Sequence, residues 1–138
     1  MNGPALAVAG AEVALVWYTQ GGGASRVQTA WSHDSGKSFG AAQRVDTGGA
    51  LGRVDASVGP GGRVLMSWLR QEAGTGTWTA RSLEGGKTLS SEFAIAAAGS
   101  GRGSGILRLA ADAEGWFAAW TEDDGRGLLC ARIRVSQP

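Results

Sequence analysis

Two arginines stand at the start of apolar segments that follow glycine-containing stretches. Arg53 comes two residues before Asp55, and Arg108 follows Arg102 by six residues, after a glycine-rich run. The planar guanidinium group pairs with a carboxylate through two parallel hydrogen bonds, so arginine suits the recognition of acidic ligands. We therefore take Arg53, Asp55, Arg102 and Arg108 as candidate ligand-binding residues. The alternative, that these arginines form surface ion pairs or ion pairs between neighbouring elements, stays open.

Other side chains with catalytic or metal-binding chemistry are scarce. His33 is the only histidine, which excludes histidine-based triads and histidine-rich metal sites. Cys130 is the only cysteine, which excludes an intrachain disulfide and a CxxC pair, and its apolar neighbours predict a small core residue. The segment 123–125 lacks the oxygen spacing of a calcium loop and is interpreted as a hairpin tip. The sequence therefore predicts no metal and no cofactor.

Length and composition indicate one β-rich domain. The chain has 138 residues, of which 43% are hydrophobic, six are tryptophan and 24 are glycine, so it can bury a core between glycine-rich turns. Its net charge of +1 creates no global field that would attract nucleic acid or an anionic membrane. No apolar run is long enough to cross a bilayer. The N-terminus lacks the basic region of a signal peptide, and the compartment stays open.

A turn motif occurs twice, fifty residues apart. The first copy runs from Ser32 to Phe39, and the second, from Ser82 to Leu89, repeats serine, an acid, glycine, lysine, a hydroxyl and a large apolar residue. In such a tight turn the acid can accept backbone N–H bonds, glycine can adopt a positive φ, and the aromatic residue is expected to fold back over the hairpin. The spacing indicates an internal repeat.

The first turn resembles the Asp-box of the sialidase and BNR-repeat family, S-x-D-x-G-x-[ST]-[WF], and matches it at every position. The second copy departs from that pattern, with Glu84 in place of the aspartate and Leu89 in place of the aromatic residue. The resemblance implies that the motif residues have a structural role in the turns. These residues are Ser32, Asp34, Gly36, Ser38 and Phe39 in the first turn and Ser82, Glu84, Gly86 and Thr88 in the second.

Tryptophans mark the same repeat along the chain. Trp17, Trp68 and Trp120 end alternating apolar segments and are spaced 51 and 52 residues apart. Both faces of these segments are apolar, so we expect each one to lie between neighbouring layers. No helix is expected. The expected strands are 5–9, 12–19, 26–32, 41–46, 53–58, 63–69, 77–82, 93–97, 106–111, 116–121 and 128–135.

Units of about 50 residues with four short antiparallel strands are typical of β-propeller blades. With the resemblance, they predict an all-β, partial sialidase-like propeller formed by the single segment 1–138. Its blades lie at about 4–47, 52–98 and 104–138, the third without an outer strand. Because propellers close with about 4–8 blades, we expect a six-bladed homodimer with an apolar contact between blade 1 and the partner's blade 3. A fibronectin-like or immunoglobulin-like sandwich is the alternative fold.

The resemblance also bears on function. It implies that arginines in an axial pocket, first of all Arg53 and Arg108, bind a glycan or another acidic ligand, with Arg70 and Glu72 on the same face. A sialidase-like mechanism would use a tyrosine nucleophile beside a glutamate, but Tyr18 is the only tyrosine and is expected inside a blade. We therefore expect a self-associating, non-catalytic module. The alternatives are a fragment of a sialidase-like glycoside hydrolase and a purely structural self-assembling half-propeller.

Overall fold

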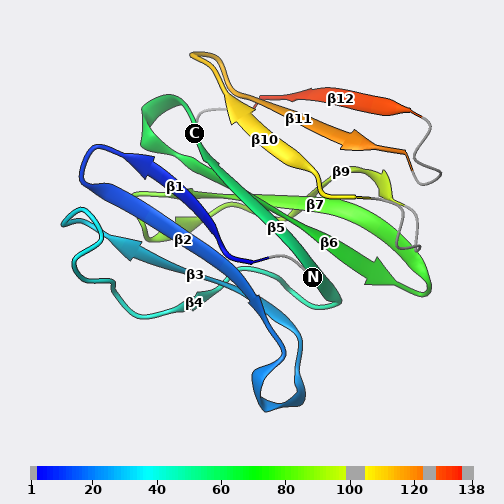
Figure 1. The fold of residues 1–138 in the computed structure, drawn as a ribbon, viewed down its shortest axis with the longest axis horizontal. Helices are drawn as coiled ribbons and strands as arrows, with labels where there is room; N and C mark the ends of the chain where they lie inside the picture. The colour runs from blue at the N-terminus through cyan, green and yellow to red at the C-terminus, as the bar shows by residue number, and fades with distance from the viewer. Residues whose placement is uncertain (1–2, 99–104, 123–126, 135–138) are drawn as a thin grey trace.

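The protein is all-β over residues 3–98, 105–122 and 127–134, which the computed structural model describes. Its strands form three antiparallel sheets that follow one another along the chain, and none of the three is closed on itself. Figure 1 shows them in succession from the lower left to the upper right. Apart from two 3₁₀ turns, Gly21–Gly23 and Pro60–Gly62, no helix occurs in the described residues. The all-β prediction is confirmed.

Each sheet is a meander in which consecutive strands are neighbours. The first sheet contains β1 (Ala5–Ala9), β2 (Glu12–Thr19), β3 (Arg26–Ser32) and β4 (Gln43–Arg44). The middle sheet contains β5 (Ala50–Val58), β6 (Val64–Glu72), β7 (Thr75–Glu84) and β8 (Thr88–Leu89), and β9 (Phe93–Ala98) also pairs with β7. The third sheet contains β10 (Arg108–Ala111), β11 (Trp116–Thr121) and β12 (Leu128–Ile133).

The alternating apolar pattern places most of the strands, and several are shorter than expected. The strand expected at 106–111 begins at Arg108, and the strand expected at 128–135 ends at Ile133. The expected strand 41–46 is reduced to Gln43–Arg44. The reason lies in the neighbouring side chain of Asp46, whose Oδ1 accepts the Val27 N–H at 2.8 Å. A side-chain acceptor thus takes a position next to the backbone ladder and limits the length of β4.

Two hydrophobic cores hold the three sheets together. The first core lies between the first and middle sheets and includes Val16 and Trp31 of one and Trp68 of the other. The second core lies between the middle and third sheets and includes Trp78 and Trp116. The strands β1 and β10 both contact β5, which lies between them (Figure 1). The middle sheet is therefore covered on both of its faces.

Equivalent residues of successive sheets point in the same direction along the stack. Trp68 belongs to the core shared with the preceding sheet, and Trp120, at the equivalent position of β11, also packs toward the sheet that precedes it. Leu65 of β6 and Ala14 of β2 point the other way, into the core shared with the following sheet. Each strand therefore presents one face to the sheet before it and the other face to the sheet after it.

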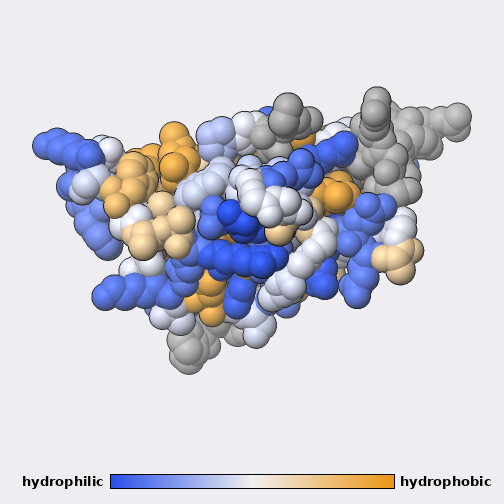
Figure 2. Space-filling model, turned by 90° about the horizontal axis from the view of Figure 1, so that it is seen from below, coloured by the Kyte–Doolittle hydropathy of each residue, from blue (hydrophilic) through white to orange (hydrophobic). Residues whose placement is uncertain are grey.

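At the two ends of the stack this pattern leaves faces without a sheet against them. The β2 strand was expected to lie between two layers, but the face that carries Trp17 belongs to neither core, because no described sheet precedes the first one. Cys130 was expected in the core and is exposed instead, because it pairs with Ala119 on the outer face of the third sheet. Figure 2 shows hydrophobic residues in several separate patches at the surface.

Within the part of the chain that the structure describes, no helix is long or apolar enough to span a membrane.

Candidate functional site

A cavity of about 360 Å³ lies beside the first strands of the three sheets. We call it the three-strand cavity. Residues 3–6 contribute from the start of β1, Val54 and Asp55 from β5, and Ile106 and Arg108 from the start of β10. These segments meet because β5 packs against both β1 and β10. The fold thus brings together side chains that are about 50 residues apart in the sequence.

Of the four predicted ligand-binding residues, Asp55 and Arg108 line the three-strand cavity. Arg53 is half-buried with a φ of 56°, and its Nη1 donates to the carbonyl oxygen of Gly105 at 2.7 Å. Asp55 also bonds across sheets, since its Oδ2 accepts the Leu109 N–H at 2.8 Å. Arg102 lies outside the described residues. Arg53 and Asp55 therefore connect the middle sheet to the third sheet.

Arg108 differs from the other described arginines in having no partner for its side chain. It is exposed at the start of β10, and no hydrogen bond or ion pair within the described residues involves its guanidinium group. The other described arginines each bond to a carboxylate or a backbone carbonyl: Arg26, Arg44, Arg53, Arg63, Arg70, Arg81, Arg132 and Arg134. A guanidinium group that has no partner among the described residues thus lines the three-strand cavity.

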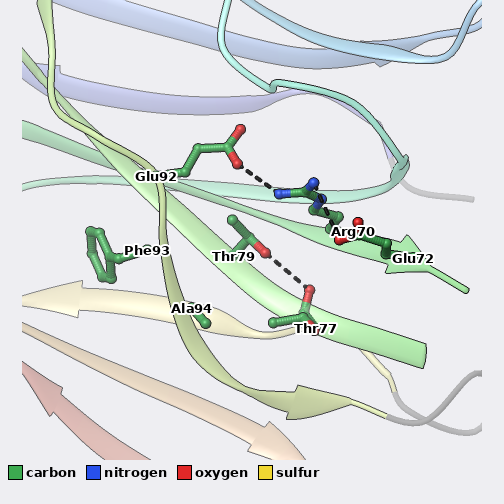
Figure 3. Close-up of a pocket in the computed structure, with 7 residues that line it drawn as sticks. All are labelled: Arg70, Glu72, Thr77, Thr79, Glu92, Phe93 and Ala94. Atoms are coloured by element: carbon green, nitrogen blue, oxygen red, sulfur yellow. Dashed lines mark hydrogen bonds and ion pairs between the residues drawn. The ribbon is translucent and has the colours of Figure 1, made fainter.

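A second pocket, of about 230 Å³, lies between β6, β7 and the segment that enters β9 (Figure 3). Arg70 lines it and lies between two acids, with Nη1 3.1 Å from Glu92 Oε2 and Nη2 3.4 Å from Glu72 Oε2. Figure 3 shows Glu92 directed toward Arg70, while the ring of Phe93 points away from it. The cation in this pocket is therefore already neutralised by the protein.

Glu92 joins the pocket to the segment between β4 and β5, and no local sequence pattern predicts this role. Its Oε1 accepts the N–H of Thr47 at 2.6 Å, while its other oxygen binds Arg70. Glu92 thereby fixes the connection between the first two sheets. Only a pairing between residues 45 positions apart could have revealed it, and no local motif encodes such a contact.

The first turn motif is closed by its aspartate. Asp34 Oδ1 accepts the Ser38 N–H at 2.9 Å and the Ser32 hydroxyl at 2.8 Å, and Asp34 Oδ2 accepts the Ser38 hydroxyl at 2.5 Å. These donors favour the ionised carboxylate, so the Ser38 hydroxyl, the Ser38 N–H and the Ser32 hydroxyl lower the pKa of Asp34 from 3.8 to about 2. Phe39, which was expected to fold back over the hairpin, is 40% exposed. Hydrogen bonds from Ser32 and Ser38 to Asp34 close this turn.

The second turn motif is closed by its backbone. Leu83 pairs with Leu89 and Glu84 with Thr88, so β7 and β8 form a short ladder across the turn. The Glu84 carboxylate is directed to Arg63, with its Oε2 3.3 Å from Nη2. Gly86 lies against the first sheet, because a Cβ atom at this position would be 2.8 Å from Trp31 Cγ. The second turn therefore also forms a contact between sheets.

No protein-family model, curated protein or solved structure matches this chain. Among the described residues, no group of three or more histidine, cysteine, aspartate or glutamate side chains is placed to hold a metal ion. The site must therefore be interpreted from its own geometry, in which a free guanidinium group faces a cavity shared by three sheets.

Proposed function

We propose that this chain is a non-catalytic, sialidase-like β-propeller module that self-associates and binds an acidic glycan or another acidic ligand in the three-strand cavity. The observation that carries the proposal is the unpartnered guanidinium group of Arg108 at a cavity formed by the first strands of three successive sheets. In a propeller these strands surround the central axis. The stacking of three successive antiparallel sheets, of four, five and three strands, supports the propeller interpretation.

The chemistry of the cavity favours a ligand with both a carboxylate and hydroxyl groups. Arg108 offers the paired donors that a carboxylate accepts. Asp55 lines the same cavity and uses only Oδ2 for the Leu109 N–H, which leaves Oδ1 available to a ligand hydroxyl. An acidic sugar carries both groups on one ring. Arg53, which bonds to Gly105 next to the cavity, would position the start of β10 rather than contact the ligand.

A purely structural, self-assembling half-propeller is the second candidate, and one observation favours it. Arg53 and Asp55 both direct their side chains to backbone atoms of the adjoining sheet. In this alternative the three-strand cavity would bind no ligand. The hydrolase-fragment alternative has less support, because Tyr18 is partly buried against the first core and its hydroxyl accepts a bond from Gln20.

Titration calorimetry with glucuronate and with glucose tests the proposal, because the two sugars differ in the carboxylate. We expect glucuronate to bind more tightly than glucose, and N-acetylneuraminate to bind without hydrolysis of a sialoside dye. Arg108→Ala should weaken glucuronate binding by roughly tenfold or more, since a hydrogen bond to a charged group contributes about 1.5–3 kcal/mol. Turnover of the dye would instead support the hydrolase fragment.

Arg26→Ala is the matched control, because Arg26 bonds to the Gly21 carbonyl in a hairpin and does not line the cavity. It should leave glucuronate binding unchanged. Equal binding of glucuronate to the wild type and to Arg108→Ala, or no binding to either, would reject a ligand role for the cavity and leave the structural candidate.

A further inference from the structure

The first sheet presents an uncovered apolar face to the outside of the stack. Leu6 and Val8 of β1 are 60% and 59% exposed. They pair with Leu15 and Val13 of β2, which share this face with Trp17; Leu15 and Trp17 are half-buried and Val13 is buried. No side chain of this group is charged. A surface of aliphatic and aromatic side chains that is contiguous across two strands is typical of a site that another protein surface covers.

The third sheet presents a second uncovered face at the other end of the stack. Phe117 and Leu128 are 39% and 75% exposed, and they share this face with Ala119 and Cys130 and, at the start of β10, with Arg108. Arg132 lies over the Phe117 ring, with its Cζ 4.5 Å from the ring centroid, and both oxygens of Asp112 accept its Nη2 at 2.9 Å. The guanidinium charge is thus paired within the third sheet, so a surface that covers this face would bury an ion pair and not an unpaired charge.

The internal repeat shows which kind of surface packs against the equivalents of the two uncovered faces inside the chain. Val64, Met66 and Trp68 of β6 pack on the preceding sheet, as do Trp116, Ala118 and Trp120 of β11. The equivalent residues of β2 are Val13, Leu15 and Trp17, which have no preceding sheet. Conversely, Leu65 and Leu69 of β6 pack on the following sheet, and their equivalents, Phe117 and Thr121, have no following sheet. The two end faces are therefore the two halves of the same kind of interface that occurs twice inside the chain.

The two turn motifs also differ in whether a preceding sheet lies against them. A Cβ atom at Gly86 of the middle sheet would be 2.8 Å from Trp31 of the preceding sheet, whereas one at Gly36, the equivalent position of the first sheet, would meet nothing within 4 Å. The first turn thus approaches the space where a preceding sheet would lie. This second observation is independent of the hydropathy of the faces.

We infer that the outer face of the first sheet docks on the outer face of the third sheet of a second copy of this chain. The inference rests on the proposed propeller and names the partner and the surfaces. Because the two faces differ, the contact is head-to-tail, and it must either close a ring or extend into a filament. Of the propeller sizes of about 4–8 sheets, six is the multiple of three, so two copies close the ring through two such contacts.

Light scattering after size-exclusion chromatography, without ligand and over a wide range of protein concentration, tests the inference. The wild type should have twice the 14.1 kDa mass of one chain. Val8→Glu should block the first-sheet face and Phe117→Glu the third-sheet face, so that each variant has the mass of one chain. Ala97→Glu, at an exposed position on β9 of the middle sheet, is the matched control and should keep the wild-type mass.

Mixing the two blocked variants decides the orientation of the contact. Phe117→Glu retains a working first sheet and Val8→Glu a working third sheet, so an equal mixture should form a dimer although neither variant does alone. If instead one variant alone stays dimeric, each copy pairs through identical faces and the inference is wrong. A monomeric wild type, or a mass that grows without limit, also overturns it. Arg108 pairs with Ala119 and so lies on the third-sheet face. Glucuronate binding is therefore measured with Val8→Glu and Ala97→Glu, which leave that face and the cavity residues unchanged, so that loss of binding and loss of the dimer are scored separately.

Chemical labelling of Cys130 tests the docking contact in the wild-type protein, without a substitution. It lies on the face that the partner would cover, and it is the only thiol in the chain. Maleimide labelling of the wild type should therefore accelerate on dilution, as the dimer dissociates. A head-to-tail contact keeps the two Cys130 thiols apart, so oxidation should not produce a disulfide-linked dimer. Labelling that is fast at every concentration, or rapid disulfide formation, contradicts the inference.

Discussion

The two turn motifs have the same backbone and different hydrogen-bond closures. In the first turn Ser35 and Gly36 have φ values of 63° and 85°, and in the second Gly85 and Gly86 have 61° and 72°. Both turns have a backbone bond from the lysine N–H to the carbonyl of the acid three residues earlier. Two central residues with positive φ are characteristic of the hairpin turn that follows the twist of β-strands. The repeat therefore conserves a conformation, although the acid differs between the copies.

The acids of the two turns act at different places. The Asp34 carboxylate bonds inside its own turn, to Ser38 and Ser32. Glu84 has one more methylene group, and its carboxylate bonds to Arg63 outside the turn, while the β7–β8 ladder supplies the closure. We conclude that side-chain and backbone hydrogen bonds are interchangeable ways to close this turn. Gly36 is needed only for the backbone conformation of the first turn. Gly86 is also needed for packing, because it lies against Trp31 of the neighbouring sheet.

The largest expected effect is the difference in the free energy of unfolding between Gly86→Ala and Gly36→Ala. Gly86→Ala introduces both a residue with φ of 72° and a Cβ atom 2.8 Å from the Trp31 ring. Gly36→Ala introduces only the unfavourable φ, which costs about 1–2 kcal/mol. Overpacking adds about 1–3 kcal/mol, so Gly86→Ala should lower the free energy of unfolding by that much more. Urea denaturation of both variants in a Val8→Glu background compares contacts within one chain. Equal losses of unfolding free energy would show that the Trp31 ring can move away from the added Cβ atom without destabilising the fold.

An intermediate effect, with a pH dependence, is expected for Asp34. The folded-state pKa of about 2 lies below the ordinary value of 3.8, so the unfolded chain takes up this proton first as the pH falls. The stabilisation by ionised Asp34 is therefore complete above about pH 4 and is lost as the pH falls toward 2.

Asp34→Asn should lower the melting temperature at neutral pH, and the difference from the wild type should shrink between pH 4 and pH 2. Thermal denaturation followed by circular dichroism across this range measures both. A difference that stays constant with pH would mean that the carboxylate charge does not contribute to the turn.

The smallest effect is expected for the acid of the second turn. The Glu84 side chain is 58% exposed and pairs with Arg63 at 3.3 Å, and exposed ion pairs of this kind contribute about 0–1 kcal/mol. Glu84→Gln should therefore change the free energy of unfolding by no more than that, measured by urea denaturation beside Asp34→Asn at pH 7. A loss as large as that of Asp34→Asn would contradict the assignment of closure to the β7–β8 ladder.

Local patterns in the sequence determined the strands and the turn conformation. Alternating side chains predicted Glu12–Thr19, Arg26–Ser32 and Trp116–Thr121 with the bounds that the structure has, because a strand places successive side chains on opposite faces. Spacing alone also placed Trp17, Trp68 and Trp120 at equivalent positions, and the structure puts the two internal ones, Trp68 and Trp120, in equivalent cores.

The tertiary structure decided which faces and side chains are committed to contacts between sheets. The sequence could not distinguish the free Arg108 from Arg53, because the Arg53 partner is the Gly105 carbonyl, 52 residues away and without a side chain. It placed Cys130 in a core because its neighbours are apolar, although both ends of a stack of sheets leave an apolar face uncovered. Hydropathy records that a face is built for burial, whereas only the arrangement of the sheets decides whether the same chain supplies the surface that covers it.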